Sequence, residues 1–192
     1  MSSSHENHHP LSLSGEIQMD TGVPINKCYQ CGKCSAGCAL ASEMDYPPSL
    51  AMRMLQTNEP LQYDKLLKSM TIWLCVSCEM CLTRCPMEID IPTLMDYLRQ
   101  KSLRAKKTNP QAKKIIAFHK SFLDSINYTG RLYEMGLIVD YKMRTGAMAQ
   151  DVAVAPKMFV KGKLNPIPEL IKGRKKVAAI FNRVHINKEG KQ

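Results

Sequence analysis

The sequence predicts a mostly α-helical protein, and three observations support this prediction. Apolar side chains recur every three or four residues along most of the chain, which is the period of an amphipathic helix. The strict alternation of apolar and polar residues that marks a half-buried strand is scarce. Several prolines precede the apolar patterns, and proline is favoured in the first turn of a helix.

The first elements are short. Residues 1–20 are expected to form a flexible N-terminal tail, because they are rich in Ser and His and contain few large apolar side chains. Two short helices are expected next, over residues 46–57 and 59–70, opened by Pro48 and Pro60. Their buried faces are predicted to carry Leu50, Met54, Leu61 and Leu66.

Longer helices are expected in the rest of the chain. A helix opened by Pro92 should end before Asn109 and Pro110. Its apolar side chains at i, i+3, i+4 and i+7 are Ile91, Leu94, Met95 and Leu98. Three further helices are expected over residues 111–126, 131–146 and 174–185, whereas the proline-containing stretch 151–173 gives no clear pattern.

Charge is distributed unevenly along the chain. Residues 1–100 carry 7 basic and 11 acidic side chains, and residues 101–192 carry 20 and 6, so their net charges of −4 and +14 give the total of +10. We therefore divide the chain into the tail (1–20), a helical domain (21–105) and a basic helical extension (106–192) for docking to a partner.

The sequence shows neither a membrane span nor a secretory signal. No stretch approaches the roughly 18 consecutive apolar residues of a span, and the N-terminus lacks a basic segment that leads into an apolar one. We expect a soluble, cytoplasmic protein with no membrane partner. The sequence also offers no nucleophile–base pair and no phosphate-binding loop.

All eight cysteines fall in two runs of the same spacing, C-x2-C-x2-C-x3-C, within "NKCYQCGKCSAGCAL" and "WLCVSCEMCLTRCPM". Clustered cysteines of a cytoplasmic protein more often bind metal than form disulfides. Three cysteines at i, i+3 and i+6 let one loop hold three corners of a cubane iron–sulfur cluster, whereas zinc would more naturally use two separated C-x2-C pairs. No histidine follows a C-x-x-C pair, which excludes attachment of a c-type haem.

This spacing resembles that of the bacterial two-cluster ferredoxins, in which the fourth cysteine of each run binds the cluster of the other run. The resemblance implies two [4Fe–4S] clusters. Carried over residue by residue, it assigns to the first cluster Cys28, Cys31, Cys34 and Cys85. It assigns to the second cluster Cys75, Cys78, Cys81 and Cys38. No cysteine is then left over, and cluster binding is expected to be coupled to folding.

Residues between the cysteines are expected to tune the clusters rather than bind them. Gly32 and Gly37 would let backbone amides approach sulfur closely. Lys33 and Arg84 would add positive charge near the clusters, although each is also typical of an ordinary surface. An apolar cover is expected from Trp73, Leu74, Val76, Met80 and Ile89.

The stretch "IWLCVSCEMCLTRCPMEIDIPTLMDYLR" resembles the α-helical ferredoxin domain, which also occurs in iron–sulfur subunits of succinate dehydrogenase and of the glycolate-oxidase type. With "NKCYQCGKCSAGC" and the basic helical tail, residues 20–190 most resemble the family of C-type iron–sulfur subunits of the CoB–CoM heterodisulfide reductases of methanogens. The resemblance implies a relay of single electrons from a flavin-containing, iron–sulfur A-type subunit to a catalytic B-type subunit. There the disulfide of coenzymes M and B is reduced, within a cytosolic complex that performs flavin-based electron bifurcation in methanogenesis and can associate with a hydrogenase.

One position departs from the family pattern. Proline commonly follows the fourth cysteine of the first run, where this chain has Ala39. Because proline fixes φ, we expect Cys38 to remain a ligand but to be less pre-organised, at the cost of a modestly weaker cluster.

Two alternative functions remain open. One is the iron–sulfur subunit of another dehydrogenase with the same domain, and the other is an iron–sulfur regulator whose basic half binds nucleic acid. The second lacks a helix-turn-helix pattern or interleaved aromatic residues, so no nucleic-acid partner is expected.

Overall fold

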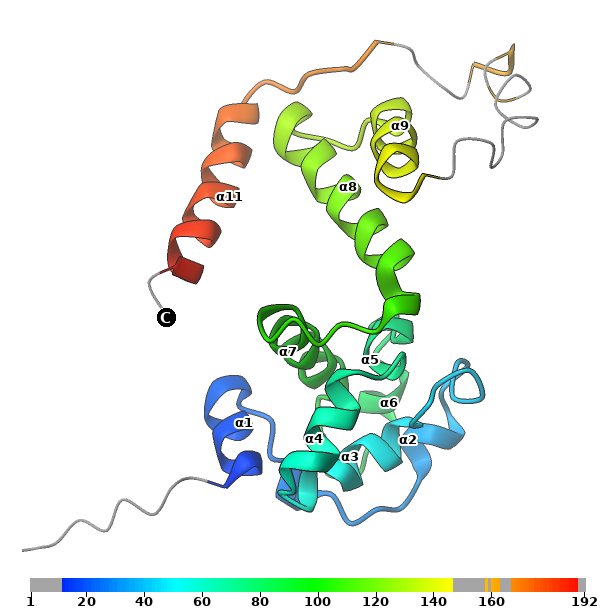
Figure 1. Ribbon diagram of the computed structural model, residues 1–192, viewed down its shortest axis with the longest axis vertical. Helices are drawn as coiled ribbons and strands as arrows, with labels where there is room; N and C mark the ends of the chain where they lie inside the picture. The colour runs from blue at the N-terminus through cyan, green and yellow to red at the C-terminus, as the bar shows by residue number, and fades with distance from the viewer. Residues whose placement is uncertain (1–11, 147–157, 159, 163–166, 190–192) are drawn as a thin grey trace, which may run out of the picture. The chain divides into compact units, whose positions relative to one another are not determined.

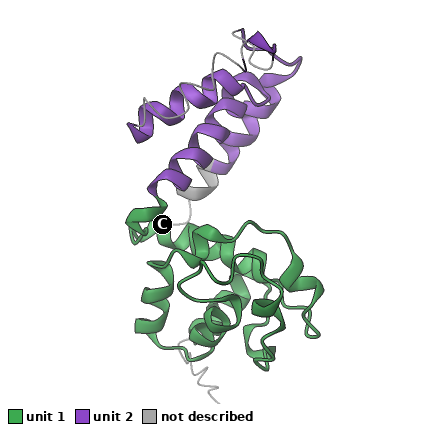
Figure 2. Ribbon diagram, turned by 90° about the vertical axis from the view of Figure 1, so that its right-hand side faces the viewer, with its two compact units in different colours: residues 1–112 green, residues 113–192 purple. Residues whose placement is uncertain are grey.

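The computed structural model describes residues 12–146, 158, 160–162 and 167–189, and these form helices, turns and irregular segments without any strand (Figure 1). The predicted mostly α-helical fold is therefore confirmed. The chain divides into two compact units, residues 1–112 and residues 113–192 (Figure 2). The division falls between Ala112 and Lys113, whereas the sequence analysis placed it between residues 105 and 106.

Short helices joined by turns make up the described part of unit 1. In chain order they are α1 (Leu13–Thr21), the 3-10 turn η1 (Ile25–Lys27), α2 (Lys33–Ala36), α3 (Pro48–Gln56), α4 (Pro60–Leu67), α5 (Thr71–Leu74), α6 (Met80–Thr83), α7 (Ile91–Arg104) and the 3-10 turn η2 (Pro110–Ala112). Among all helices within the described residues, none is both long enough and apolar enough to cross a membrane.

Helix α1 corrects the extent of the expected tail, because residues 13–20 are helical and packed. Ser12 caps the helix by accepting a hydrogen bond from the Gly15 amide at 3.3 Å, and Ile17 is completely buried. Lys101 of α7 forms an ion pair with Glu16 at 3.1 Å. Lys101 also pairs with Asp20 of α1 at 3.6 Å. One buried apolar side chain and two cross-helix ion pairs thus attach a polar segment to unit 1, and composition alone does not show such an attachment.

The core of unit 1 lies where α3, α4, α5 and α7 meet. Its completely buried side chains include Leu55, Leu66, Ile72, Leu94 and Leu98. Met54 and Leu66 are buried as predicted, but Leu50 and Leu61 are 45% and 63% exposed. These two predictions are wrong because α3 and α4 turn neighbouring positions toward the core, namely Ala51, Met52, Leu55 and Leu67.

Unit 2 is built around α8 (Lys113–Thr129), which packs against α9 (Glu134–Thr145) and α11 (Arg174–Glu189). The ring of Phe118 on α8 meets the edge of Tyr141 on α9, with their centroids 6.1 Å apart. Arg144 of α9 also forms an ion pair with Asp124 of α8 at 2.7 Å. The three helices expected in this half of the chain are therefore present, and most of the uncertain stretch 151–173 lies outside the described residues.

Candidate metal centre

The two cysteine-bearing loops of unit 1 have the same backbone form. Equivalent residues of the loops are 47 positions apart, and the same two steps adopt a left-handed conformation in each loop. The angle φ is 61° at Gln30 and 77° at Gly32 in the first loop. It is 52° at Ser77 and 62° at Glu79 in the second. The repeat in the sequence is thus also a repeat in the backbone.

This backbone form suits an anionic group held by cysteines. Alternation of right-handed and left-handed residues turns successive backbone N–H groups toward one side, which creates a concave site for an anion. Left-handed geometry is unfavourable for side chains other than glycine, and such residues collect at functional sites where the surrounding structure holds them. Gln30, Ser77 and Glu79 therefore hold a backbone conformation that is unfavourable for residues with a side chain.

The structure brings the predicted ligands of the first cluster together. Helix α2 of the first loop contacts α6 of the second, although the loops are far apart in sequence. Three cysteines of the first loop and one of the second line a common cavity, namely Cys28, Cys31, Cys34 and Cys85. Apolar side chains from later elements close the cavity, including Met52, Ile89 and Ile91.

Two of the predicted ligands of the second cluster, Cys75 and Cys81, lie near each other. Cys75 lies close enough to Cys81 to raise the pKa of that thiol together with burial, which is the larger cause, to about 11. Burial likewise raises the pKa of Cys34 in the first loop. Cys38 directly follows Gly37, and Gly37 packs against Arg84, the residue before Cys85. The fourth cysteines of the two loops are therefore both next to the contact between the loops.

The donor set fits two iron–sulfur clusters. All eight cysteines are free of disulfides, and thiolates are the ligands that iron–sulfur clusters require. Raised thiol pKa values mean that cluster binding must displace protons, so binding becomes dependent on pH. In addition, the buried indole N–H of Trp73, two residues before Cys75, has no acceptor among the described residues. Among the described residues, no three or more His, Cys, Asp or Glu side chains are grouped so that they could hold a single metal ion.

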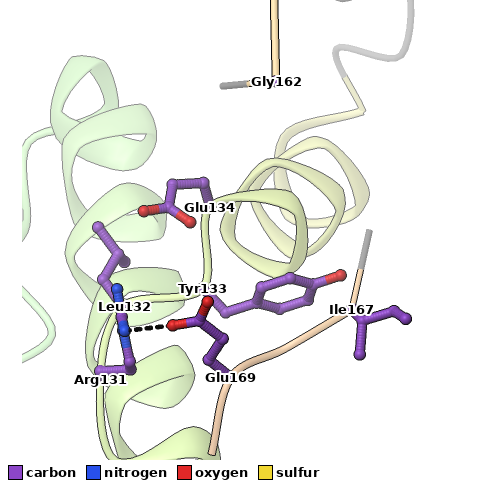
Figure 3. A pocket seen from close by; sticks show the side chains of 7 residues that line it. All are labelled: Arg131, Leu132, Tyr133, Glu134, Gly162, Ile167 and Glu169. Carbon is purple, nitrogen blue, oxygen red and sulfur yellow. Dashed lines mark hydrogen bonds and ion pairs between the residues drawn. The ribbon is translucent and has the colours of Figure 1, made fainter. Parts of the chain in front are cut away.

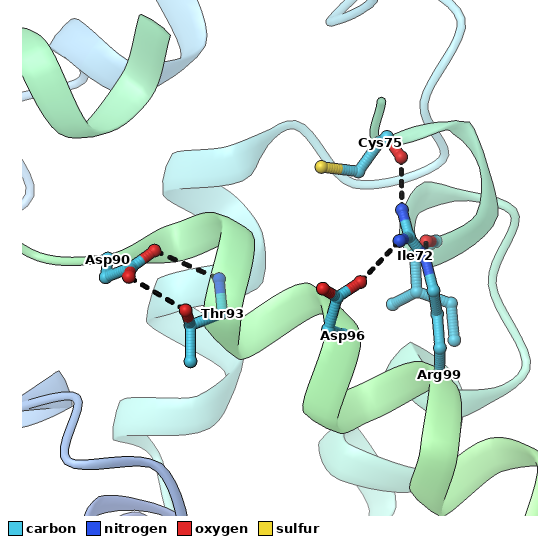
Figure 4. Close-up of polar contacts among 6 residues, drawn as sticks. All are labelled: Ile72, Cys75, Asp90, Thr93, Asp96 and Arg99. Carbon is cyan, nitrogen blue, oxygen red and sulfur yellow. Dashed lines mark hydrogen bonds and ion pairs between the residues drawn. The ribbon is translucent and has the colours of Figure 1, made fainter. Parts of the chain in front are cut away.

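Two helices outside the loops hold the first cysteine of each loop. The Gln56 side chain at the end of α3 donates hydrogen bonds to the carbonyl oxygens of Cys28 at 2.7 Å and of Ile25 at 3.2 Å. Arg99 of α7 serves the equivalent residues of the second loop, because it donates to the carbonyl oxygens of Ile72, at 2.5 Å, and of Cys75 (Figure 4). The cysteine spacing gave no indication of either residue.

The side chain of Gln30 lies between Gln56 and the sulfur of Cys28 in the first loop. Its side-chain nitrogen lies 2.9 Å from Gln56 Oε1 and 3.4 Å from Cys28 Sγ. The opposite amide orientation would donate to the Ser49 carbonyl at 3.0 Å. It would also let the Gln30 oxygen accept from the Arg53 amide at 3.3 Å, but that oxygen would then face both the Gln56 oxygen and the sulfur, which are acceptors. Because Gln56 already uses its nitrogen for two carbonyls, and a thiolate only accepts, the nitrogen of Gln30 faces Cys28.

The expected tuning residues have different roles from one another. Gly32 has the left-handed backbone that glycine favours. Gly37 has an ordinary right-handed backbone, and its missing side chain instead makes room for Arg84. Trp73, buried as expected, precedes the second loop, whereas Val76 and Met80 are 70% and 43% exposed. The apolar cover predicted over the cysteines is therefore incomplete on the side of these two residues.

Unit 2 contains a hollow without cysteines. Between the α8–α9 turn and the residues Gly162, Ile167 and Glu169 lies a pocket of about 180 Å³, bordered by the ion pair of Arg131 with Glu169 at 2.6 Å (Figure 3). Arg131 and Glu169 pair with each other, which leaves Glu134 as the other charged side chain of the lining, and neither a thiol nor an imidazole lines the pocket. This pocket offers no ligand set for a metal or cluster.

Comparison with known families decides the nature of the centre. The family of 4Fe-4S dicluster domains matches residues 24–89, which include both loops and all eight cysteines. This part of the chain is similar in sequence to 4Fe-4S dicluster domains. The predicted cofactors, two [4Fe–4S] clusters, are thereby confirmed.

Curated relatives of the chain carry matching names. The C-type iron–sulfur subunit of CoB–CoM heterodisulfide reductase from Methanopyrus kandleri is 35% identical over 44% of this chain and 42% of its own length. The C-type subunit of the ferredoxin:CoB-CoM heterodisulfide reductase of Methanosarcina acetivorans is 31% identical over 45% and 34%. The C-type subunit of the H2:CoB-CoM heterodisulfide, ferredoxin reductase of Methanothermobacter marburgensis is 27% identical over 55% and 56%. The chain is thus homologous to these heterodisulfide reductase subunits, and the matches span about half or less of their length.

Proposed function

We propose that this dicluster protein is an electron-relay subunit of a cytoplasmic heterodisulfide reductase complex. In this role it passes single electrons from a flavin-containing A-type subunit to a B-type subunit, which reduces the disulfide of coenzymes M and B. The bound clusters supply one-electron redox chemistry. The cavity shared by three cysteines of the first loop and Cys85 of the second carries the proposal, because it joins both loops at one junction.

The exposure of the cysteines supports a relay. Cys31 and Cys78, the second cysteine of each loop, are exposed, whereas the other six are partly buried. Each loop therefore presents one ligand at the surface, and partner proteins are proposed to dock at these two points. The chain itself orients the ligands through Gln56 and Arg99 and shields the inner face with Met52 and Ile89.

Anaerobic purification with bound partners tests the function. We expect about eight irons per chain, two interacting cubane signals by electron paramagnetic resonance (EPR), and co-purification with a flavoprotein and a disulfide-reducing subunit. Transfer of electrons to the disulfide of coenzymes M and B should require this chain. Co-purification with a different dehydrogenase would instead identify a relay in another oxidoreductase, and a single cluster per chain would contradict both.

Matched cysteine variants test the crossed ligand assignment. Cys31→Ser and Cys78→Ser provide the reference EPR spectra for damage to the first and the second cluster. We propose that Cys85→Ser reproduces the spectrum of Cys31→Ser, because Cys85 lies in the cavity of the first loop. Cys38→Ser should reproduce that of Cys78→Ser. The opposite correspondence would show that each loop binds its own cluster.

A further inference from the structure

Arg84 and Gly37 occupy equivalent positions of the two cysteine loops and lie directly against each other. A Cβ atom on Gly37 would lie 2.6 Å from Cδ, 2.7 Å from Nη1 and 2.8 Å from Nε of Arg84. A Cβ atom essentially never comes within 3.0 Å of such atoms, so the arginine side chain occupies the space that any other residue at position 37 would need. The backbone of Gly37, with φ −97° and ψ −2°, would accept other residues without strain.

The charge of Arg84 is not neutralised locally. Among the ion pairs of the described residues, none involves Arg84 or Lys33, whereas Arg99 is paired with Asp96 at 2.6 Å. Arg84 and Lys33 line one surface hollow with Ala36. Arg84 precedes Cys85 in the sequence and packs against Gly37, the residue before Cys38. Arg84 is therefore next to the fourth cysteine of its own loop and one residue away from that of the other loop.

From this placement we propose that the positive charge of Arg84 raises the reduction potentials of both clusters. Gly37 makes this placement possible, because it has no side chain in the space that Arg84 occupies. The inference rests on the proposed crossed ligation, in which Cys85 and Cys38 each belong to the cluster of the opposite loop. A reduced cluster carries one more negative charge than an oxidised one, so a fixed cation at their junction stabilises the reduced form of each. Other residues at position 37 would displace the guanidinium from this junction.

Redox titration of the anaerobic protein, followed by EPR, tests the proposal. Arg84→Gln should lower the equilibrium constant for reduction of both clusters about threefold to tenfold, or about 28–59 mV at 59 mV per tenfold for one electron. Arg84→Lys should retain most of the potential, because it keeps the charge. Lys65→Gln removes the same charge on α4, which carries no cysteine, and should change neither potential.

Gly37→Ala separates charge placement from assembly. This variant keeps the arginine but displaces it, so it should lower both potentials in the same direction as Arg84→Gln. If the Arg84→Gln protein fails to assemble clusters, the Gly37→Ala protein still tests the proposal. Unchanged reduction potentials in the Gly37→Ala protein would overturn it. Iron analysis of the unaltered protein comes first: fewer than about eight irons per chain would refute the proposed function itself. Eight irons with unshifted potentials in the variants would refute only the role of Arg84.

Discussion

The guanidinium of Arg99 donates a hydrogen bond to the carbonyl oxygen of Cys75, the first cysteine of the second loop (Figure 4). The side chain of Arg99 is only 14% exposed, and it also bonds the Ile72 carbonyl at 2.5 Å. In the first loop, the Gln56 amide takes the equivalent role on Ile25 and Cys28. Each loop is therefore fixed at its start by one side chain from a packed helix.

Replacing Arg99 with leucine should destabilise the second loop. The change leaves two carbonyl oxygens without their donor, and hydrogen bonds from charged donors contribute about 1.5–3 kcal/mol each. We expect the cluster-loaded protein to unfold at a lower denaturant concentration and to lose iron faster. Asp96→Asn is the matched control, because it removes the exposed ion pair at 2.6 Å but keeps both carbonyl bonds. An effect of Asp96→Asn as large as that of Arg99→Leu would assign the role to the ion pair.

Replacing Gln30 with leucine should lower the reduction potential of the cluster for which Cys28 is a proposed ligand. Gln30 donates to Cys28 Sγ at 3.4 Å, and donors to sulfur raise the reduction potential of a cluster. Redox titration followed by EPR measures the shift. Ser77→Ala changes the equivalent residue of the other loop and should have the smaller effect. Within the described residues, the Ser77 side chain makes no hydrogen bond to sulfur. Equal shifts in both variants would contradict a direct role of the amide.

Replacing Glu79 with glycine should stabilise unit 1 by about 1 kcal/mol. Glu79 has φ 62°, and the left-handed region costs residues with a Cβ about 1–2 kcal/mol, which glycine avoids. The reciprocal change Gly32→Ala should cost a similar amount, since a Cβ there meets no atom within 4 Å and only the backbone is strained. Anaerobic denaturant titration measures both. A loss of stability in Glu79→Gly would show that the carboxylate contributes more than the strain costs.

Replacing Ala39 with proline should stabilise the first loop. Both loops end in the same turn, in which the Ala41 amide donates to the Cys38 carbonyl at 3.2 Å and the Glu88 amide to the Cys85 carbonyl at 3.1 Å. Ala39 and Pro86 occupy the position of this turn at which proline is favoured. We expect anaerobic denaturant titration to show a gain of about 0.4–1 kcal/mol from the restricted unfolded chain. Pro86→Ala should lose a similar amount, and a loss of stability in both variants would show that the turns are not equivalent.

Local patterns in the sequence were enough to predict the helical class, the helices α3, α4, α7, α8, α9 and α11, and the number and kind of the clusters. Helical periodicity, first-turn prolines and cysteine spacing each lie within a few turns of chain, so no distant contact is needed to recognise them. Tertiary packing decided the burial of Leu50 and Leu61, which depends on the face that each helix turns to the core. It also attached α1 through Ile17, against the expectation of a flexible tail.

Other features of the centre join residues that are distant in the sequence. Arg99 and Cys75 are 24 positions apart, and Gln56 and Cys28 are 28 apart, so neither contact leaves a sign in the motif itself. Gly37 shows the difference most clearly. The sequence indicates a glycine beside a cysteine, and only the contact between α2 and α6 shows that its missing side chain makes room for Arg84. Local spacing specifies which atoms can bind a cluster, whereas the packing of the two loops determines which charges and donors surround it.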